Sequence, residues 1–332
     1  MTFLPGHTSL AILASQKLGH VMQCQGVARA LGLEPQMRNV APRAFFRVLA
    51  PWGPPDPGDK SDAPDAALRR PYPDIAIASG RETVPYRRAL KRLSGGRTFS
   101  VYIGDPRTSH GVFDLICAPE HDRLRGGNVI STLTSPHPRD AAARDAARND
   151  PDPSVAKLAS PRIAMLLGGP SGQYKFSSGD IDAIANIAAQ ILASGAGLMI
   201  SPSRRTPPAL LTAIRNAAGA GAAQTASRLF IWDGTGANPY LSMLAMADAF
   251  VVTTDSVNMI SEAIATGRPV HICQPSGHAG KFAHFIDTLL ARGIVRPWAG
   301  RIEHWSYEKV DATPFIAQEI ATRYRAFAAQ LK

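Results

Sequence analysis

Short apolar runs alternate with amphipathic segments along all 332 residues of the chain. This alternation is typical of repeated strand–helix–strand units, which form parallel sheets. In the first half we expect strands at 10–14, 74–78, 98–103, 113–118 and 128–132. In the second half we expect strands at 162–167, 198–201, 229–232, 249–253 and 269–273.

Helical patterns separate these strands, at 21–31, 84–93, 179–193, 207–217, 240–246, 257–265, 282–290 and 313–331. The order favours an α/β fold of two Rossmann-like, doubly wound domains that face each other across a cleft. The expected domains are residues 1–137 and 161–312. Residues 138–160 are expected to be a linker, because they hold an Ala/Arg/Asp run and several prolines. A last helix at 313–332 is expected to pack back on the first domain.

Composition narrows the class of protein. Hydrophobic residues make up 45% of the chain and charged residues 19%, which excludes wholesale disorder. The longest uncharged run, 183–203, carries Asn, Gln, Ser and Gly, so no membrane span is predicted. Residues 1–10 lack the pattern of a secretory signal. Three scattered cysteines (Cys24, Cys117 and Cys273) indicate no metal site or disulfide set, so we expect a reducing, cytoplasmic compartment.

The formal net charge is +10 and the isoelectric point about 9.8. This excess indicates anionic partners, such as phosphorylated small molecules or an anionic membrane surface. The chain has no block of five or more Lys and Arg residues, and no basic stripe interleaved with aromatic residues. Sequence-specific binding of nucleic acid is therefore not expected.

A glycine-rich loop follows the strand at 162–167. Gly168, Gly169 and Ser171 lie there, and glycines allow backbone N–H groups to approach an anion closely. Lys175 follows and is a candidate to neutralise a phosphate. The alternative is a tight turn without a ligand. The GK[ST] ending of a Walker A loop is absent.

Two arginines follow the next strand. Arg204 and Arg205 stand just before a helix that Thr206 is expected to cap, which makes them a candidate diphosphate clamp. The alternative is a capped helix with solvated arginines.

The strongest candidate element begins where the strand at 249–253 ends. Asp255 and Ser256 are expected to cap the following helix, whose first N–H groups would then face a ligand. Glu262 lies one to two turns further along and is expected to accept hydrogen bonds from a ribose diol. The alternative is that Ser256 caps the helix, Asp255 complements its dipole and Glu262 lies on the surface.

The pattern Asp255-Ser-x-x-x-x-x-Glu-Ala-x-x-x-Gly-x-Pro-Val resembles the nucleotide-sugar signature of GT-B glycosyltransferases. An example of that class is the lipid-linked N-acetylglucosamine transferase of peptidoglycan synthesis. The resemblance implies that Glu262 binds the ribose and that the helix N-terminus faces the diphosphate. It implies a nucleotide sugar as substrate, and no cofactor is expected.

A second resemblance covers nearly the whole chain. Its motifs are Lys17-x-Gly19-His20-x-x-Gln23, Ala78-Ser-Gly-Arg81, Gly104-Asp-Pro-Arg107, Ala118-Pro-Glu-His-Asp122, Asn128-Val-Ile130, Gly168-Gly-Pro170, Ser203-Arg-Arg-Thr-Pro207 and the segment from Thr253 to Val270. In this order they resemble the elongated-mitochondria (mitochondrial fission) protein family, in its bacterial branch. Plant members of that family are linked to recruitment of a dynamin-related protein to mitochondria, which implies a docking role.

Polar residues at strand ends of the first half suit an acceptor-binding domain. His20 follows the first strand and is a candidate general base, with Asp105 or Asp122 as the alternative base. Otherwise His20 only packs against or caps its helix. The further cleft candidates are Lys17, Arg81, Arg107, Glu120, His121 and Asp122, with Lys281 and His284 in the second half. No metal site is expected, because Glu120, His121 and Asp122 are adjacent and cannot easily converge on one ion.

Residues 38–52 combine basic and aromatic side chains. The members are Arg38, Arg43, Phe45, Phe46, Arg47 and Trp52. They are candidates to seat the first domain on an anionic membrane surface, which would make the protein peripheral on the inner face of a membrane. The alternative is a partly buried helix with solvated arginines.

These features predict a metal-independent inverting glycosyltransferase with an unknown, membrane-associated acceptor. His20 or Asp105 would remove a proton from the acceptor, while Arg204 and the helix N-terminus at Ser256 would stabilise the leaving diphosphate. The alternative is a non-catalytic adaptor at a membrane surface, as the plant family members imply. An epimerase or oxidoreductase is not expected, because the chain lacks the G-x-G-x-x-G fingerprint.

Overall fold

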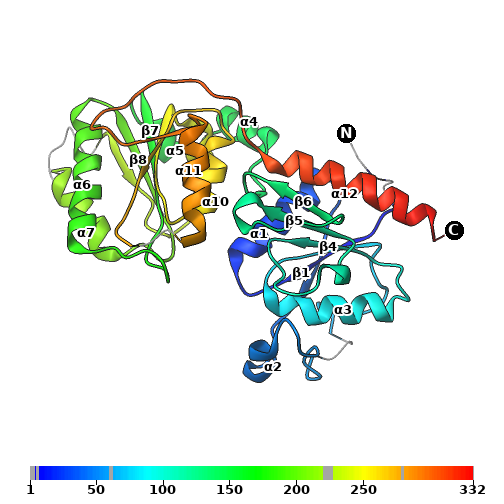
Figure 1. Ribbon diagram of the computed structural model, residues 1–332. Coiled ribbons are helices and arrows are strands. Elements are labelled where there is room, and N and C mark those ends of the chain that lie inside the picture. Colours follow the sequence, from blue (N-terminus) through cyan, green and yellow to red (C-terminus); the bar gives the residue numbers. More distant parts are fainter. Residues whose placement is uncertain (1–3, 5–6, 60–62, 220–226, 278–279, 332) are drawn as a thin grey trace. The chain divides into compact units, whose positions relative to one another are not determined.

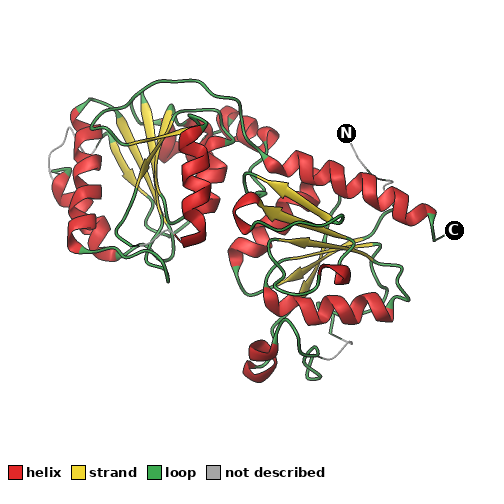
Figure 2. Ribbon diagram, in the orientation of Figure 1, coloured by secondary structure: helices red, strands yellow, loops and turns green. Residues whose placement is uncertain are grey.

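The structure is a computed structural model that describes residues 4, 7–59, 63–219, 227–277 and 280–331. It divides into two compact units. Unit 1 comprises Met1–Pro138 and Asp311–Lys332, and unit 2 comprises Arg139–Val310. Each unit has a six-stranded parallel sheet with helices on both faces (Figures 1 and 2). The expected fold class, α/β with two doubly wound sheets, is confirmed.

The sheet of unit 1 has the order β2-β1-β3-β4-β5-β6. Its strands are β1 (Leu10–Ala14), β2 (Gln36–Asn39), β3 (Ile75–Ala78), β4 (Phe99–Ile103), β5 (Leu115–Pro119) and β6 (Val129–Thr132). The chain enters at β1, adds β2 on one side and then continues on the other side from β3. The direction of winding therefore changes between β1 and β3, the position at which doubly wound sheets bind ligands beyond their carboxyl ends.

Helices α1 (Leu18–Ala30) and α12 (Ala312–Ala329) cover one face of this sheet, and α3 (Val84–Leu93) covers the other (Figure 1). Ile316 and Ile320 of α12 are fully buried in the same core cluster as Val27 of α1. The last helix of the chain thus completes unit 1. Short 3-10 turns follow three strands: η1 (Arg81–Thr83), η2 (His110–Val112) and η3 (Glu120–Asp122).

The sheet of unit 2 has the order β12-β11-β10-β7-β8-β9. Its strands are β7 (Arg162–Leu167), β8 (Gly197–Pro202), β9 (Leu229–Ile231), β10 (Ala249–Thr253), β11 (Val270–Cys273) and β12 (Val295–Pro297). The winding starts at β7, runs through β8 to β9, and then returns to β10 on the other side of β7. The change of direction lies between β7 and β10.

On one face of this sheet lie α6 (Ser178–Ala193) and α7 (Pro208–Ala217), whose apolar side chains share a core cluster with β7, β8 and β10. Three further helices of unit 2 are α9 (Tyr240–Met246), α10 (Val257–Ile264) and α11 (Ala283–Ala291), the last preceded by η4 (Gly280–Phe282). Helix α6 begins with a capping box between Ser177 and Asp180, which fixes where it starts.

The segment interpreted as a linker, 138–160, folds onto unit 2 from Arg139 onwards. It forms α4 (Ala141–Asn149) and α5 (Pro153–Ala156). Arg148 donates from Nε and Nη2 to the carbonyl of Ala245 in α9, at 3.1 and 2.5 Å, and Arg144 donates to the carbonyl of Ala265 at 3.1 Å. Both arginines therefore satisfy free carbonyls at the ends of two helices.

The sequence pattern did not predict β2 or β12, and it gave α2 (Ala44–Leu49) only as the alternative of a partly buried helix. Both strands are sheet edges with short, polar sequences (Gln-Met-Arg-Asn and Val-Arg-Pro), so no apolar run marks them. No helix of the described residues is long and apolar enough to cross a bilayer.

A strap, residues 298–310, runs without helix or strand over the surface of unit 2 (Figure 1). His271 of β11 is fully buried beneath it, and its Nε2 accepts a hydrogen bond from the backbone N–H of Glu303 at 3.2 Å. The rings of Trp298 and Trp305 lie edge-on to the imidazole, with centroids at 5.3 and 5.1 Å. The neutral imidazole is therefore the form that holds the strap.

Replacement of Ile320 by alanine is expected to destabilise the protein by about 2–5 kcal/mol, because it opens a cavity in the core of unit 1. Phe315→Ala on the same helix, where the side chain is 47% exposed, is expected to change the unfolding free energy by about 0.5 kcal/mol or less. Urea-induced unfolding measures both. Equal losses for the two variants would contradict the packing of α12 on unit 1.

Acidic pH is expected to weaken the attachment of the strap to unit 2, because protonated His271 cannot accept the N–H of Glu303. Burial lowers the pKa of His271, so the unfolded chain binds a proton near pH 6.5 more readily than the folded chain does. The unfolding free energy is expected to fall by about 1 kcal/mol from this group between pH 8 and pH 5.5. The unfolding free energy of His271→Gln should fall less than that of the wild type over this pH range. In His284→Gln, a control at an exposed position, it should fall as much as in the wild type. If His271→Gln kept the full pH dependence, His271 would not be its source.

Candidate functional site

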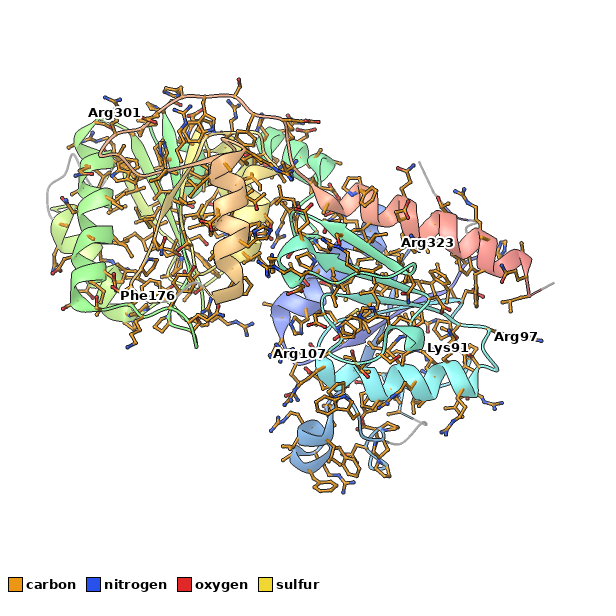
Figure 3. The ribbon with its side chains drawn as sticks, in the orientation of Figure 1. Lys91, Arg97, Arg107, Phe176, Arg301 and Arg323 are labelled. Atoms are coloured by element: carbon orange, nitrogen blue, oxygen red, sulfur yellow. The ribbon has the colours of Figure 1, made fainter. Side chains whose placement is uncertain are left out.

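In unit 2, three loops of the candidate site leave the carboxyl ends of neighbouring strands. They follow β7, β8 and β10, which stand next to one another in the sheet. This edge includes the point where the winding changes direction. Phe176, labelled in Figure 3, lies beyond the end of β7 and packs against the core of the unit. The fold thus brings together the Gly168, Arg205 and Asp255 segments that lie far apart in the sequence.

The two glycines after β7 donate their N–H groups within the protein. Gly168 donates to Thr253 Oγ1 at 2.8 Å, and Gly169 donates to Asp255 Oδ2 at 2.8 Å. A Cβ atom on Gly168 would lie 2.1 Å from the Asp255 carboxylate, and one on Gly169 would lie 2.1 Å from the carbonyl oxygen of Arg205. Glycine is needed here for close approach of the protein's own groups, whereas the sequence interpretation assigned these N–H groups to an anion.

Asp255 and Arg205 form an ion pair across the edge. Arg205 Nη2 donates to Asp255 Oδ2 at 3.1 Å, while Nη1 donates to the carbonyls of Gly169 and Pro170 at 2.7 and 2.9 Å. The Asp255 side chain is fully buried, and its Oδ1 has no hydrogen-bond partner among the described residues. Burial raises the pKa of Asp255, and the neighbouring polar groups of Gly169, Thr253 and Arg205 oppose that rise.

Thr206 does not cap α7, contrary to expectation. The N-cap residue is Pro207, and the helix starts at Pro208. Thr206 Oγ1 instead lies 2.9 and 2.5 Å from the carbonyl oxygens of Leu167 and Gly168, and accepts from the N–H of Ser203 at 2.8 Å. This hydroxyl ties the loop after β8 to the loop after β7.

Helix α10 starts at this edge. Ser256 occupies its N-cap position, as expected, but its side chain makes no capping hydrogen bond, and Asp255 turns to Gly169 instead. Arg204 and Lys175 are exposed, and Ser171 Oγ accepts from the N–H groups of Gln173 and Tyr174. Positive groups and a helix N-terminus without a side-chain cap therefore lie on one edge.

Glu262 is buried on α10, not on the surface. Its Oε2 accepts a hydrogen bond from the hydroxyl of Tyr240 at 2.5 Å. Burial raises the pKa of Glu262, while this bond and the charge of Arg139 favour the ionised form. The Arg139 guanidinium lies over the Tyr240 ring, 5.7 Å from its centre. Tyr240 and Arg139 were missed by the sequence reasoning, because no motif marks either residue.

In unit 1, His20 lies at the change of winding between β1 and β3. Its Nδ1 is 3.2 Å from the hydroxyl of Ser15, which follows β1, and 2.7 Å from the position of a Cβ on Gly80, which follows β3. Burial and the charge of Lys17 lower the pKa of His20, and Glu82 opposes this shift. His20 is thus neutral at pH 7 and able to accept a proton.

The other candidates of unit 1 follow β1, β3, β4 and β5. Arg81 and Lys17 are exposed, and Asp105 Oδ1 accepts from the N–H of Arg107 at 2.8 Å, in a turn where Arg107 has φ = 53° (Figure 3). Glu120, His121 and Asp122 form η3, with the His121 ring 4.0 Å from the Asp122 carboxylate. Among the residues that the structure describes, no three His, Cys, Asp or Glu side chains are grouped to hold a metal ion.

Two candidates of unit 2 follow β11. Lys281 belongs to η4, and His284 is exposed in the first turn of α11.

Arg38, from the basic and aromatic segment, is buried and has a structural role. Arg38 is buried in β2 and donates to the carbonyls of Arg69 and Pro71, both at 2.8 Å, so its assignment to a membrane surface is wrong. Arg43 pairs with buried Asp56 at 2.6 Å and lies over the Phe46 ring. The role of Arg38 could not be predicted from the sequence, because it depends on the backbone carbonyls of Arg69 and Pro71, which only the fold brings close.

Four side chains of that segment are open to solvent, whereas Phe46 is half-buried. Phe45 is 67% exposed, Val48 70% and Trp52 69%, and Arg47 is also exposed. None of the residues of α2 is buried.

Solved structures similar to this chain have the GT-B arrangement of two α/β domains. A putative UDP-N-acetylglucosamine 2-epimerase from Listeria monocytogenes matches with a TM-score of 0.54 and 11% identity, over 97% of this chain and 88% of that chain. UDP-GlcNAc 2-epimerase from Neisseria meningitidis matches with a TM-score of 0.50 and 10% identity, over 98% and 99%. The expected GT-B-like fold is confirmed. These epimerases have a similar fold, so the absence of a G-x-G-x-x-G motif no longer excludes the epimerase class for this chain.

Sequence relatives identify the family. Mitochondrial fission protein ELM1 of Arabidopsis thaliana is 30% identical over 279 residues, which are 76% of this chain and 63% of the plant protein. The uncharacterized protein RP120 of Rickettsia prowazekii is 25% identical over 287 residues, 75% of this chain and 79% of that protein. The family profile described as "Mitochondrial fission ELM1" matches residues 18–324, so the chain belongs to the mitochondrial fission ELM1 family.

Proposed function

We propose that unit 2 binds a nucleoside diphosphate, in the form of a nucleotide sugar, at the carboxyl edge of β7, β8 and β10. The observation that carries the proposal is the N-terminus of α10, where Ser256 makes no side-chain cap while Arg204 is exposed on a neighbouring loop. N–H groups of a first helical turn and guanidinium groups are the usual ligands of a diphosphate. Lys175 adds a third positive group at this edge.

Glu262 is proposed to bind the ribose. It lies six residues beyond Ser256, which is about 9 Å along the helix at 1.5 Å per residue. Tyr240 occupies one carboxylate oxygen and fixes the side chain, which leaves the other oxygen as the acceptor for a ribose hydroxyl. The similar UDP-GlcNAc 2-epimerase from Neisseria meningitidis, in the structure with UDP-GlcNAc bound, supports this class of ligand.

Transfer of the sugar to a hydroxyl acceptor is the proposed reaction. The acceptor oxygen would bond to the anomeric carbon, the bond from that carbon to the diphosphate oxygen would break, and a general base would take the acceptor proton, which is the role predicted for His20 from the sequence. Arg204 and the α10 N-terminus would stabilise the charge that develops on the diphosphate. Asp105 is the weaker candidate for the base, because Oδ1 already accepts the N–H of Arg107.

The second candidate function is an adaptor at an anionic membrane surface, favoured by the exposed apolar side chains around α2. Polar contacts hold this region in place: Arg43 pairs with Asp56, and Arg88 Nη2 donates to the carbonyls of Pro51 and Gly53 at 2.6 and 2.7 Å. An apolar surface that is held rigidly, carries an aromatic Trp52 and includes exposed Arg47 suits a lipid headgroup region.

A thermal-shift series tests the nucleotide site. UDP-GlcNAc at about a hundred times its Kd should stabilise the full chain by about 2.7 kcal/mol. Arg204→Ala and Glu262→Gln should each reduce this shift, whereas Glu308→Ala, an exposed acid on the strap, should keep it. If neither UDP-GlcNAc nor any other nucleotide sugar or nucleoside diphosphate shifts the wild type, the site is refuted.

Vesicle co-sedimentation tests the membrane surface. Phe45→Ser with Trp52→Ser should abolish binding to vesicles of phosphatidylglycerol and phosphatidylcholine. Arg47→Gln should weaken it by about 1 kcal/mol on anionic vesicles only. Leu93→Ser, an exposed leucine at the end of α3, is the control and should bind as the wild type does. Equal binding by all four proteins, or by none, would refute the α2 surface.

A further inference from the structure

Asp255 places a negative charge at the edge that is proposed to hold a diphosphate. Its carboxylate precedes Ser256 by one residue, and the side chain is fully buried. In a buried site two like charges repel strongly, because little water screens them. The residue is thus unsuited to contact phosphate directly, although the sequence pattern placed it among the diphosphate ligands.

Among the side chains that the structure describes, one positive charge pairs with Asp255. Arg205, from the loop after β8, donates to Oδ2 at 3.1 Å and also binds two backbone carbonyls. The other titratable groups that act on or respond to Asp255 are Tyr174 and Cys273, from the loop after β7 and from β11. Burial raises the pKa of Tyr174 and raises that of Cys273 to about 12, so both remain neutral between pH 6 and pH 8.

The two oxygens of Asp255 have different roles. Oδ2 accepts the N–H of Gly169 and a hydrogen from Arg205, whereas Oδ1 is buried without a partner among the described residues. An ionised carboxylate can only accept hydrogen bonds, so the negative charge on Oδ1 is not stabilised by any hydrogen bond from the described residues. A proton on Oδ1 would leave both bonds of Oδ2 in place.

We propose that Asp255 binds one proton together with the anionic ligand, so that binding at the α10 N-terminus is coupled to proton uptake. Two routes lead to the same result. If Arg205 stays on Asp255, one guanidinium must balance both the carboxylate and the diphosphate. If Arg205 turns to the diphosphate, the buried carboxylate loses its counter-charge. In both cases the neutral acid is favoured, and the proton comes from solvent.

This coupling makes Asp255 a positioning residue that holds Gly169 and Arg205. It rests on the proposed nucleotide site. The appropriate probe is UDP-GlcNAc, because its diphosphate is a diester with no ionisation near neutral pH. A terminal phosphate on a free nucleoside diphosphate would itself titrate near pH 6 and obscure the result.

The experiment is titration calorimetry of the full chain with UDP-GlcNAc at pH 6, 7 and 8, in pairs of buffers with different ionisation enthalpies. The wild type should take up a measurable fraction of one proton per ligand bound, and its affinity should fall by up to tenfold for each unit by which the pH rises. Asp255→Asn should show no uptake and should bind more tightly than the wild type at pH 8. Asp248→Asn, at the opposite end of β10, should behave as the wild type; its carboxylate accepts the N–H of Arg162 at 2.8 Å.

The outcomes separate the two proposals. Binding by the wild type with no proton uptake and a flat pH dependence overturns the coupling alone. Uptake that persists in Asp255→Asn assigns the proton to another group and also overturns it. Absence of binding in all three proteins overturns the nucleotide site, and the coupling with it. If Asp255→Asn does not fold, binding by the wild type without proton uptake still overturns the coupling.

Discussion

The carboxylate of Asp255 fills the space that a side chain on Gly168 would need, 2.1 Å from the position of its Cβ. From there it binds the N–H of Gly169 and the guanidinium of Arg205. One side chain thereby connects the loops after β7, β8 and β10. The position of Ser256 and the start of α10 follow from this contact, because they come directly after Asp255 in the chain. The spacing of the positive groups at this edge depends on that buried carboxylate.

Both units place their candidate chemistry where the winding of the sheet changes direction. In unit 1 that position holds His20 beside Ser15 and Gly80, and in unit 2 it holds Asp255 beside Gly168. His20, Gly168 and Asp255 could be predicted from the sequence, because the argument needs only the ends of buried strands and the rule that parallel strands share a carboxyl edge. The two sheets and most of their helices could be predicted for the same reason: apolar runs mark strands that are buried on both faces.

The partners of polar side chains could not be predicted in this way. Thr206 was expected to cap a helix and instead binds the loop after β7; Arg38 was expected on the surface and instead binds carbonyls more than 30 residues away. A sequence pattern gives the position of a side chain along the chain, whereas its hydrogen bonds depend on which backbone groups the tertiary fold leaves unsatisfied. Edge strands β2 and β12 were missed because they carry no apolar run.

Unit 2 is a continuous stretch of chain inserted between two parts of unit 1, whose last helix, α12, supplies Ile316 and Ile320 to its core. During synthesis on the ribosome, unit 2 is therefore complete before unit 1 can bury that face of its sheet. The N–H of Ala312 then bonds to Thr134 at 3.2 Å, and the N–H of His137 bonds to Thr313 at 3.0 Å, which joins the two points where the chain leaves and re-enters unit 1. Unit 1 can therefore complete its core only after unit 2 has been synthesised, whereas the N-terminal domain of a multidomain protein generally folds first.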